Sequence, residues 1–546
     1  MFARVKKSGK YQYLQIVENR KEHGKVKQRV ISTVGRMDRL QAKGRVETLI
    51  RSLSRFSEKA LLILSGKSDV TADAKKIGPV LVFERLWRET GIQKSIKRLL
   101  VGRKYEFNVE RAIFLTVLHR LMVTGSDRHC ERWHRDYLIE GVDDLQLHHL
   151  YRAMAFIGEE CQDQKGATPF APRCNKDRVE ESMFAYRRDL FSELDLVFFD
   201  TTSIYFEGRG GETLGQRGFS KDHRPDLKQM VVGAVIDDKG QPICCEMWPG
   251  NTTDVKTLIP IVTRLQRRFH ISQVCIVADR GMISAATLKE LETPDNTIPY
   301  ILGARMRKVK QIRDEVLSHP GRYQKVRPEG VEAKDPEPLQ VKQVKLNDRR
   351  YVICLNPRQA RKDARDREAI IANLKTQLKK GPKALVGNKG YRKYVTLKKD
   401  SARIDEAKIK YEARFDGKYV LTTNTDLSTA QVALKYKELW QVERVFRDIK
   451  SLFNTRPVFH HHDETIRGHV FCSFLALVLR KELEQRLQSA GYHFEWAAIK
   501  QDLKTLQRVT IKENGQRMAI RSECKGVCSK VFQAVKVALP PTIKQL

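Results

Sequence analysis

The chain has 546 residues, of which 102 are Lys or Arg and 66 are Asp or Glu, so its net charge is +36. A charge this positive favours a polyanionic partner, with nucleic acid the leading candidate, over a surface that merely carries many lysines. The longest apolar stretch, Val470–Leu479, is far shorter than the roughly 20 residues of a membrane span, and no signal-peptide core is found near the N-terminus. We therefore expect a cytoplasmic protein without a membrane partner.

The cysteines and histidines give little sign of a soft-metal site. Ten cysteines are scattered without a C-x-x-C pair, which favours reduced core thiols over a disulfide framework or zinc site. The run "FHHHDETIRGH" carries His460, His461, His462 and His469. Consecutive histidines cannot all face one ion, so a polar loop before a helix is favoured over a metal site.

The first third of the chain divides into two predicted regions. Residues 1–45 alternate apolar and polar positions around the turn "KEHGK", which is typical of a small β-unit. Residues 46–190 follow a helical pattern, for example in "VERAIFLTVLHRLMVTGS", which ends in a Gly-Ser stop. Because this helical region is basic, we expect it to bind DNA.

Residues 191–289 are predicted to form the first part of a catalytic domain. The stretch "LDLVFFDTTSIYFEG" reads as a buried strand with Asp200 at its centre, and "KQMVVGAVIDDKGQPICCEMWPG" reads as a hairpin with its turn at Asp237–Gly240. An amphipathic helix starting near Asn251 or Thr252 follows, and then a buried strand that ends at Asp279. The order strand, strand, strand, helix, strand is the opening of a ribonuclease H-like fold.

The remaining residues fall into three predicted segments. Residues 290–425 mix basic helical stretches with short strands and are too long for a loop, so they indicate an inserted α+β subdomain. Residues 426–480 return to the catalytic domain with a long helix capped by Ser428, and residues 481–546 form a basic C-terminal region. The predicted fold class is α/β: a ribonuclease H-like mixed sheet with an inserted subdomain, preceded by the β-unit and the helical region.

Three acids stand out by their context. Asp200 lies within the first strand, Asp279 ends the fourth strand, and Glu443 lies on the long helix after the insertion. Alone, Asp200 would fit a buried ion pair with an arginine equally well. Together, three neighbouring carboxylates cannot all ionise without cations. Mg²⁺ is a hard cation that prefers oxygen ligands, so two Mg²⁺ ions would neutralise the three carboxylates. Two such ions also suit phosphodiester chemistry.

The helix "YKELWQVERVFRDIK" carries a second signal. Tyr436, Glu443 and Lys450 are seven residues apart, so on one continuous helix they would lie on one face. A tyrosine hydroxyl and a lysine beside a metal-binding glutamate would contact phosphates near the scissile bond. Arg444 and Arg447 add positive charge nearby.

The segments "FFDTTSIYFEG", "GFSKDHRPDLKQMVVGAVIDDKGQPICCEMWPGNTTD", "VADRGM" and "YKELWQVERVFRDIK" resemble the DDE transposases of bacterial insertion sequences. The resemblance is to the branch with a β-rich insertion and a tyrosine-arginine-glutamate-lysine signature. It covers about residues 190–480, and "GKYQYLQIVENR…RVISTVG" also fits that branch. It implies that Asp200, Asp279 and Glu443 are the catalytic, metal-binding triad. Leu439 stands where the signature has its arginine.

The resemblance also implies an activity and partners. Such an enzyme cleaves the ends of its own insertion sequence and transfers them into target DNA by cut-and-paste transposition. It works with two Mg²⁺ ions per active site, which Mn²⁺ can replace. It acts as a homodimer on the terminal inverted repeats, close to the bacterial nucleoid. The residues expected to contact DNA are Thr201, His223, Arg224, Lys228, Arg280, Tyr436, Arg444, Arg447 and Lys450.

Two alternatives remain open at the level of sequence. A stand-alone metal-dependent nuclease or resolvase of the same fold would need the triad but not the insertion. A DNA-binding descendant without catalysis would be expected to lose an acid, yet all three are present. The polar stretch "SKDHRPDLKQ" fits an active-site loop and an ordinary loop held by internal ion pairs equally well.

Overall fold

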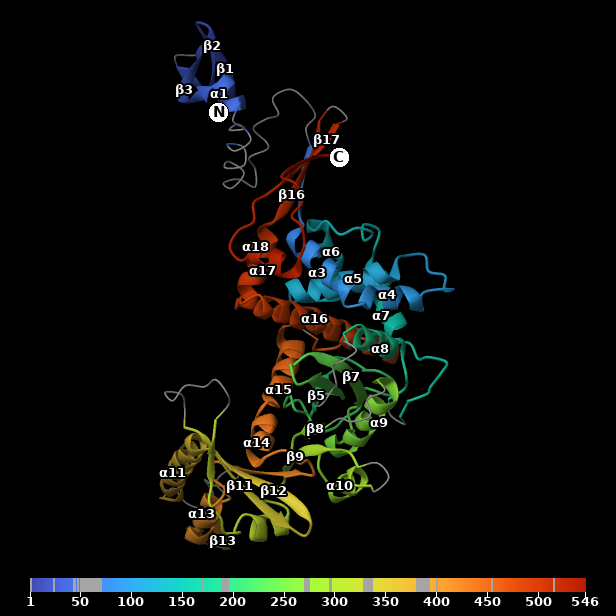
Figure 1. Ribbon diagram of the computed structural model, residues 1–546, viewed down its shortest axis with the longest axis vertical. Coiled ribbons are helices and arrows are strands. Elements are labelled where there is room, and N and C mark those ends of the chain that lie inside the picture. Colours follow the sequence, from blue (N-terminus) through green and yellow to red (C-terminus); the bar gives the residue numbers. More distant parts are fainter. Residues whose placement is uncertain are drawn as a thin grey trace. The chain divides into compact units, whose positions relative to one another are not determined.

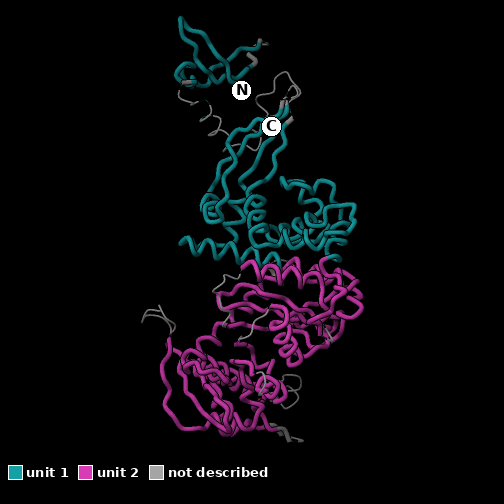
Figure 2. The backbone as a smooth tube through the Cα atoms, turned by 45° about the vertical axis from the view of Figure 1, so that its right-hand side comes forward, with its two compact units in different colours: residues 1–156, 452–454, 475–546 teal, residues 157–451, 455–474 magenta. Residues whose placement is uncertain are grey.

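A computed structural model of the protein describes residues 2–22, 25–42, 46, 49, 71–168, 171–187, 196–269, 275–293, 297–327, 337–379, 393–398, 401–452, 455–513 and 516–546. The chain forms two compact units (Figure 2). Unit 1 comprises Met1–Phe156, Leu452–Asn454 and Leu475–Leu546, and unit 2 comprises Ile157–Ser451 and Thr455–Phe474. The predicted boundary at residues 190–191 lies outside the described residues. All ten cysteines are free thiols, as predicted.

Unit 1 begins with a three-stranded antiparallel sheet of strands β1 (Phe2–Ser8), β2 (Tyr11–Glu22) and β3 (Lys25–Arg36). The two alternating segments of the sequence form β2 and β3, and β1 is an additional strand. Helix α1 (Met37–Ala42) follows and packs against β2 and β3. At Gly35, where φ is +152°, an added Cβ would lie 3.5 Å from Leu40 of this helix.

Residues 46–156 of the predicted helical region belong to unit 1, and the rest of that region belongs to unit 2. Helix α5 (Val109–Met122) is buried along its whole length, and Trp87 on α3 (Gly78–Glu89) donates to Glu110 Oε1 at 2.7 Å. A second sheet pairs β4 (Thr71–Lys76) with C-terminal strands in the order β18-β17-β16-β4, which the sequence did not predict. The other elements are α4 (Ile92–Leu99), α6 (Asp127–Trp133), η3 (His134–Asp136), α7 (Leu147–Gly158), α17 (Trp496–Thr505), β16 (Gln507–Glu513), β17 (Gln516–Arg521), α18 (Cys528–Val535) and β18 (Ile543–Gln545).

Unit 2 is built on a nine-stranded mixed sheet. Five of its strands have the order β9-β8-β5-β6-β7, and β9 belongs to this part of the sheet although the sequence analysis assigned residues 290–425 to the insertion. Strand β5 pairs antiparallel with β6 and parallel with β8, and β8 pairs parallel with β9. This is the ribonuclease H-like arrangement, with the first and fourth strands adjacent as predicted. The strands are β5 (Leu196–Tyr205), β6 (Gln229–Asp237), β7 (Pro242–Pro249), β8 (Cys275–Ala278) and β9 (Tyr300–Ala304).

The insertion extends this same sheet. Strand β15 (Lys418–Thr423) pairs antiparallel with β9, and β12, β11 and β10 continue outward from β15. The insertion also contains helices and a separate hairpin, so its α+β character is as predicted. Its other elements are η5 (Ile312–Val316), β10 (Gln324–Val326), β11 (Leu339–Leu346), β12 (Arg349–Leu355), α11 (Pro357–Lys379), β13 (Val395–Lys398), β14 (Ser401–Ile404) and α13 (Glu406–Ala413).

Helices cover both faces of the catalytic strands (Figure 1). Helix α9 (Leu258–Phe269) packs its apolar side into a core with Val197 and Phe199 of β5. It begins later than the predicted cap, after the short helix η4 (Asp254–Lys256). Helix α15 (Trp440–Arg447) packs against β5 and β6. Helix α10 (Ala285–Leu291) follows β8, and none of the described helices has the length and hydropathy of a membrane span.

The predicted long helix after the insertion is not continuous, so this prediction was wrong. Helix α14 (Thr429–Lys437) begins at Ser428 with a capping box that includes Gln431, as the sequence indicated. The backbone then tightens, because Leu439 N–H bonds to Tyr436 and Val442 N–H bonds to Leu439, which are i→i+3 bonds. After α15 the chain widens into the π-turn η7 (Asp448–Leu452). The seven-residue spacing therefore does not describe one helical face. Helix α16 (Asp463–Ser489) follows.

A buried ionic network joins α8 (Asn175–Arg187), β7 and α9. Arg264 donates to Glu246 at 2.8 Å and to Asp177 at 3.0 Å. Arg268 donates to Glu246 at 2.9 Å and to Glu180 at 2.5 Å. Lys176 Nζ lies 2.6 Å from Asp177 and donates to the Cys245 carbonyl at 2.8 Å. Three buried acids thus face three buried cations, which anchors α8 and α9 to the sheet.

Truncating Glu246 should destabilise unit 2 strongly. Glu246→Ala leaves Arg264 and Arg268 buried without one of their counter-charges, so we expect a loss of about 3–5 kcal/mol in unfolding free energy, measured by denaturant unfolding. Glu337→Ala is the matched control, because its pair with Arg361 is exposed and should be worth nothing measurable. Equal effects of the two substitutions would contradict the structural role of the network.

Candidate active site

Two of the three predicted catalytic acids lie side by side. In the parallel pair of β5 and β8, Phe199 is opposite Ala278, so Asp200 and Asp279 occupy the next positions of adjacent strands. Adjacent strands are about 4.8 Å apart. Alternation along β5 places Phe199 on the α9 side and Asp200 on the α15 side. The strand pairing alone therefore creates an acidic pair under α15.

Asp200 is partly buried within an otherwise buried strand. Burial raises the pKa of Asp200 to about 6, with Asp279 and Asp254 adding to the rise and Lys221 and the Thr201 N–H opposing it. The Thr201 N–H donates to Asp200 Oδ1 at 2.7 Å. A buried carboxylate whose pKa is raised in this way is typical of a functional site rather than of a hydrophobic core.

Asp254 and Lys221 form a contact with β5 that the sequence analysis missed. Thr201, predicted as a DNA contact, is buried, and its hydroxyl donates to Asp254 Oδ1 at 2.6 Å. Lys221 Nζ donates to the Thr201 carbonyl at 2.8 Å and lies 3.1 Å from Asp254 Oδ2. Thr201 thus supports the site from within the protein. The sequence showed Asp254 only as an acid in the first turn of a helix.

The turn after Asp279 is held by groups from β9 and α14. Arg305 donates to the carbonyls of Arg280 and Gly281, both at 2.9 Å. The Tyr436 hydroxyl donates to Asp279 Oδ1 at 3.1 Å, and burial, followed by Asp279, raises the pKa of Tyr436. Position 303 on β9 requires glycine because Tyr436 lies close to the backbone there: an added Cβ would be 2.4 Å from the Tyr436 hydroxyl.

The third predicted acid, Glu443, is exposed on α15. Its neighbours Val442 and Val445 are buried and hold the helix on the sheet. Within the described part of the chain, the carboxylates of Asp200, Asp279 and Glu443 do not form a group whose oxygens all lie within 4.8 Å of one another. The strand register therefore brings Asp200 and Asp279 together, and Glu443 lies on the helix that packs against β5.

Lys450 is held by an acid that the sequence placed only in a polar loop. Lys450 Nζ donates to Asp222 Oδ1 at 2.7 Å, and Arg456 donates to the same oxygen at 2.5 Å. Burial lowers the pKa of Lys450, against the effect of Asp222. The Asp222 side chain is 6% exposed, and its second oxygen is buried without a hydrogen-bond partner. The loop that carries Asp222 is thus bound to Lys450 on η7 and to Arg456.

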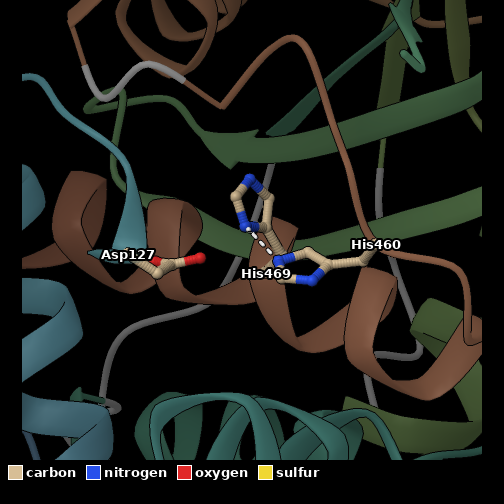
Figure 3. Close-up of side chains that lie close together, drawn as sticks. All are labelled: Asp127, His460 and His469. Atoms are coloured by element: carbon tan, nitrogen blue, oxygen red, sulfur yellow. Dashed lines mark hydrogen bonds between the residues drawn. The ribbon is translucent and has the colours of Figure 1, made fainter. Parts of the chain in front are cut away.

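A histidine pair fixes the segment that carries Arg456. His460 Nε2 lies 3.2 Å from His469 Nδ1 on α16 (Figure 3), and His469 Nε2 lies 3.3 Å from the Thr455 carbonyl. Because a carbonyl only accepts, His469 donates from Nε2 and His460 donates to His469 in the neutral pair. At the end of β5, the Val458 N–H donates to the Tyr205 carbonyl, and the Glu207 N–H donates to the Val458 carbonyl. The histidines therefore hold this segment beside the catalytic strand.

The other residues predicted to contact DNA lie around the loop and α15. Arg224 makes an exposed pair with Asp226 at 2.9 Å and lies over the ring of Tyr205. His223 has a φ of 58°, and the Arg444 side chain is partly exposed. Arg447, Lys228 and Arg280 are exposed. Leu439, in the place of the signature arginine, is buried and cannot reach DNA, and Trp440 is 53% exposed.

The acids at this site fit a divalent cation. Asp200, Asp254 and Asp279 are all oxygen donors, and they interact electrostatically while Lys221 pairs with one of them. The other acidic cluster, of Asp177, Glu180 and Glu246, faces three cations and needs no metal. The excess negative charge at Asp200 and Asp279 suits a hard cation such as Mg²⁺.

Comparison with known proteins gives two family matches. The model of the transposase DDE domain matches residues 192–479, more than half of the chain, and the model of the IS1634 family transposase N-terminal domain matches residues 3–67. A solved structure titled "Cryo-EM structure of piggyBac transposase synaptic complex with hairpin DNA (SNHP)" is similar with a TM-score of 0.38 and 11% identity, over 78% of this chain and 79% of that chain. No curated protein matches.

Replacing the Asp200 carboxylate should stabilise the metal-free protein. Burial disfavours the ionised group, so Asp200→Asn should raise the unfolding free energy at neutral pH by about 1–2 kcal/mol in the presence of EDTA. Mg²⁺ should then stabilise the parent but not the variant, as measured by thermal unfolding. Asp238→Asn, at the exposed turn of the β6–β7 hairpin, is the control. A variant that responds to Mg²⁺ as the parent does would rule out Asp200 as a ligand.

Proposed function

The chain belongs to the DDE transposases, and from that premise we propose that it moves its own insertion sequence by cut-and-paste transposition. DNA transposase activity and a requirement for divalent metal follow from the family. The proposal adds the order of steps, the metal and the DNA partners. The observation that carries it is the pairing of β5 with β8, which sets Asp200 and Asp279 at adjacent positions.

We propose that Asp200, Asp279 and Glu443 hold two Mg²⁺ ions, which Mn²⁺ can replace. When bound, these ions polarise phosphate oxygens and stabilise the charge that develops on them. Glu443 lies on the helix that packs over β5 and is exposed. We therefore propose that its carboxylate completes the metal site from the α15 side of β5.

On the strand that is transferred, the reaction consists of two displacements at phosphorus. In the first, the oxygen of a water molecule bonds to phosphorus at the end of the element, and the bond to the 3′-oxygen breaks to leave a 3′-hydroxyl. In the second, that 3′-oxygen bonds to a phosphorus of the target strand and displaces the target's own 3′-oxygen. Each step exchanges one P–O bond for another, so positioning and charge stabilisation supply most of the catalysis.

The chain's own groups position the DNA. We propose that Lys450 and Tyr436 contact phosphates beside the scissile bond, with support from Arg280, Arg444, Arg447, His223, Arg224 and Lys228. Asp222 and Arg456 fix Lys450 at the edge of the site. The DNA partners are the terminal inverted repeats and the target, bound by a homodimer in the bacterial cytoplasm at the nucleoid.

Removal of any one of the three acids should abolish both steps. Asp200→Ala, Asp279→Ala and Glu443→Ala should each lower cleavage and joining by about three orders of magnitude or more, on duplexes carrying the element's ends with Mg²⁺. Asp238→Ala should keep parental rates. Cleavage without joining by the parent would favour a nuclease or resolvase, and full activity of Glu443→Ala would remove that residue from the triad.

Loss of the Tyr436 hydroxyl should slow catalysis without unfolding the site. Tyr436→Phe removes one hydrogen bond to a charged Asp279, so we expect about a ten-fold lower joining rate at saturating DNA. Tyr419→Phe is the control, because Tyr419 stacks on Tyr436 with ring centroids 5.8 Å apart and is not the group that bonds to Asp279. Equal effects of the two variants would assign the loss to packing.

A further inference from the structure

The four-stranded antiparallel sheet of unit 1 lies outside both family matches. Its strands β4, β16, β17 and β18 come from residues 71–76 and 507–545. The family models match residues 3–67 and 192–479. Membership of the family therefore assigns no role to this sheet.

The strand register gathers cations on one face of this sheet. Lys75 on β4 pairs with Arg508 on β16, and Arg508 pairs with Arg521 on β17. Alternate residues of a strand return to the same face, so Lys512 and its partner on β17 lie there too, as does the one cation of β18. We call this surface the basic face, and its cations are Lys75, Arg508, Lys512, Arg517, Arg521 and Lys544.

The opposite face of the sheet is mainly apolar. Val509, Ile520 and Ile543 pair with one another across β16, β17 and β18. Lys76, the one cation among the described side chains of that face, pairs with Asp136 at 3.3 Å. On the basic face, Asp73 is the one acid among the side chains that the structure describes. Positive charge is therefore concentrated on one side of the sheet instead of being scattered over it.

Most cations of the basic face have no counter-ion. The Arg521 guanidinium donates to the carbonyls of Pro540 at 2.7 Å and Ser522 at 2.8 Å. Within the described part of the chain, no acid forms an ion pair with any of the other five cations. Lys512 and Arg517 are exposed at the far end of the β16–β17 pair. An anionic ligand would relieve the repulsion between these neighbouring positive charges.

The basic face is also hollowed. A hollow of about 190 Å³ is lined by Asp73, Lys75, Arg508, Thr510 and Lys512, among others. A second hollow of about 260 Å³ has mainly apolar walls and is also lined by Arg508, together with Arg521 and Lys544. Because Arg508 lines both hollows, the cations surround one continuous concave surface. Such a surface suits an extended anion rather than a single small one.

We propose that the basic face binds the phosphate backbone of target DNA. The inference rests on the proposed function, since strand transfer requires a second duplex besides the element's ends. Lysine and arginine contact phosphates without reading sequence, and the amides Gln507 and Gln545 lie on the opposite face. This chemistry suits a duplex of any sequence, such as target DNA, better than the terminal repeats, which a transposase must distinguish from other DNA.

The test is the salt dependence of binding by the full chain to two unrelated duplexes that lack the repeats. The double variant Lys512→Gln and Arg517→Gln removes two cations that are exposed on the basic face. If both contact phosphates, the slope of log K against log salt should become shallower by about 1.8 on both duplexes. The target concentration for half-maximal joining of a supplied 3′-hydroxyl end should rise by about ten-fold. Circular dichroism and thermal unfolding check that the variant is folded.

The double variant Lys525→Gln and Lys536→Gln is the matched control, because it removes two exposed cations of unit 1 that lie outside the basic face. It should keep the parental slope. Hydrolytic cleavage of the element's ends should persist in both double variants, and its absence from the parent would count against the proposed function instead. A slope change no larger than that of the control, or an equal loss of affinity for the end duplex, would overturn the assignment of the basic face to target DNA.

Discussion

The parallel pairing of β5 with β8 is the constraint on which the site depends. It places two carboxylates on adjacent strands, where neither can move away without breaking the sheet. The cost is visible at Asp200, whose pKa burial raises to about 6. The surrounding groups reduce this cost only in part, through the Thr201 N–H and Lys221. The charge that is left suits a divalent cation, in agreement with the metal dependence that the transposase DDE domain implies.

The two acidic clusters of unit 2 show how the same fold treats charge in two ways. In the first cluster, three buried acids face three buried cations, so its charges balance; the residues are Asp177, Glu180, Glu246, Lys176, Arg264 and Arg268. This cluster holds α8 and α9 on the sheet. Asp200 lies within β5, Asp279 follows β8 and Asp254 begins η4, and Lys221 pairs with Asp254. One cluster stabilises the scaffold, and the other leaves charge for a ligand.

Much of the catalytic core could be predicted from the sequence, because its signals are local. Alternation and turn residues predicted β5, the β6–β7 hairpin and Asp279 at the end of β8, and Ser428 predicted the start of α14. The long helix was wrong, because a tight turn at Leu439 and a π-turn from Asp448 interrupt it, and neither irregularity changes the apolar periodicity of the sequence. Asp222, Asp254 and Lys221 were missed as a group because their partners are distant in sequence.

The continuous sheet explains how a large insertion can act on the catalytic centre. Strand β15 of the insertion pairs with β9, and β9 pairs with β8, which ends one residue before Asp279. Arg305, just after β9, holds the turn beyond Asp279, while Tyr419 on β15 stacks on Tyr436, whose hydroxyl bonds to Asp279. The insertion therefore contacts the surroundings of Asp279 by two routes, one through Arg305 and one through the stack of Tyr419 on Tyr436.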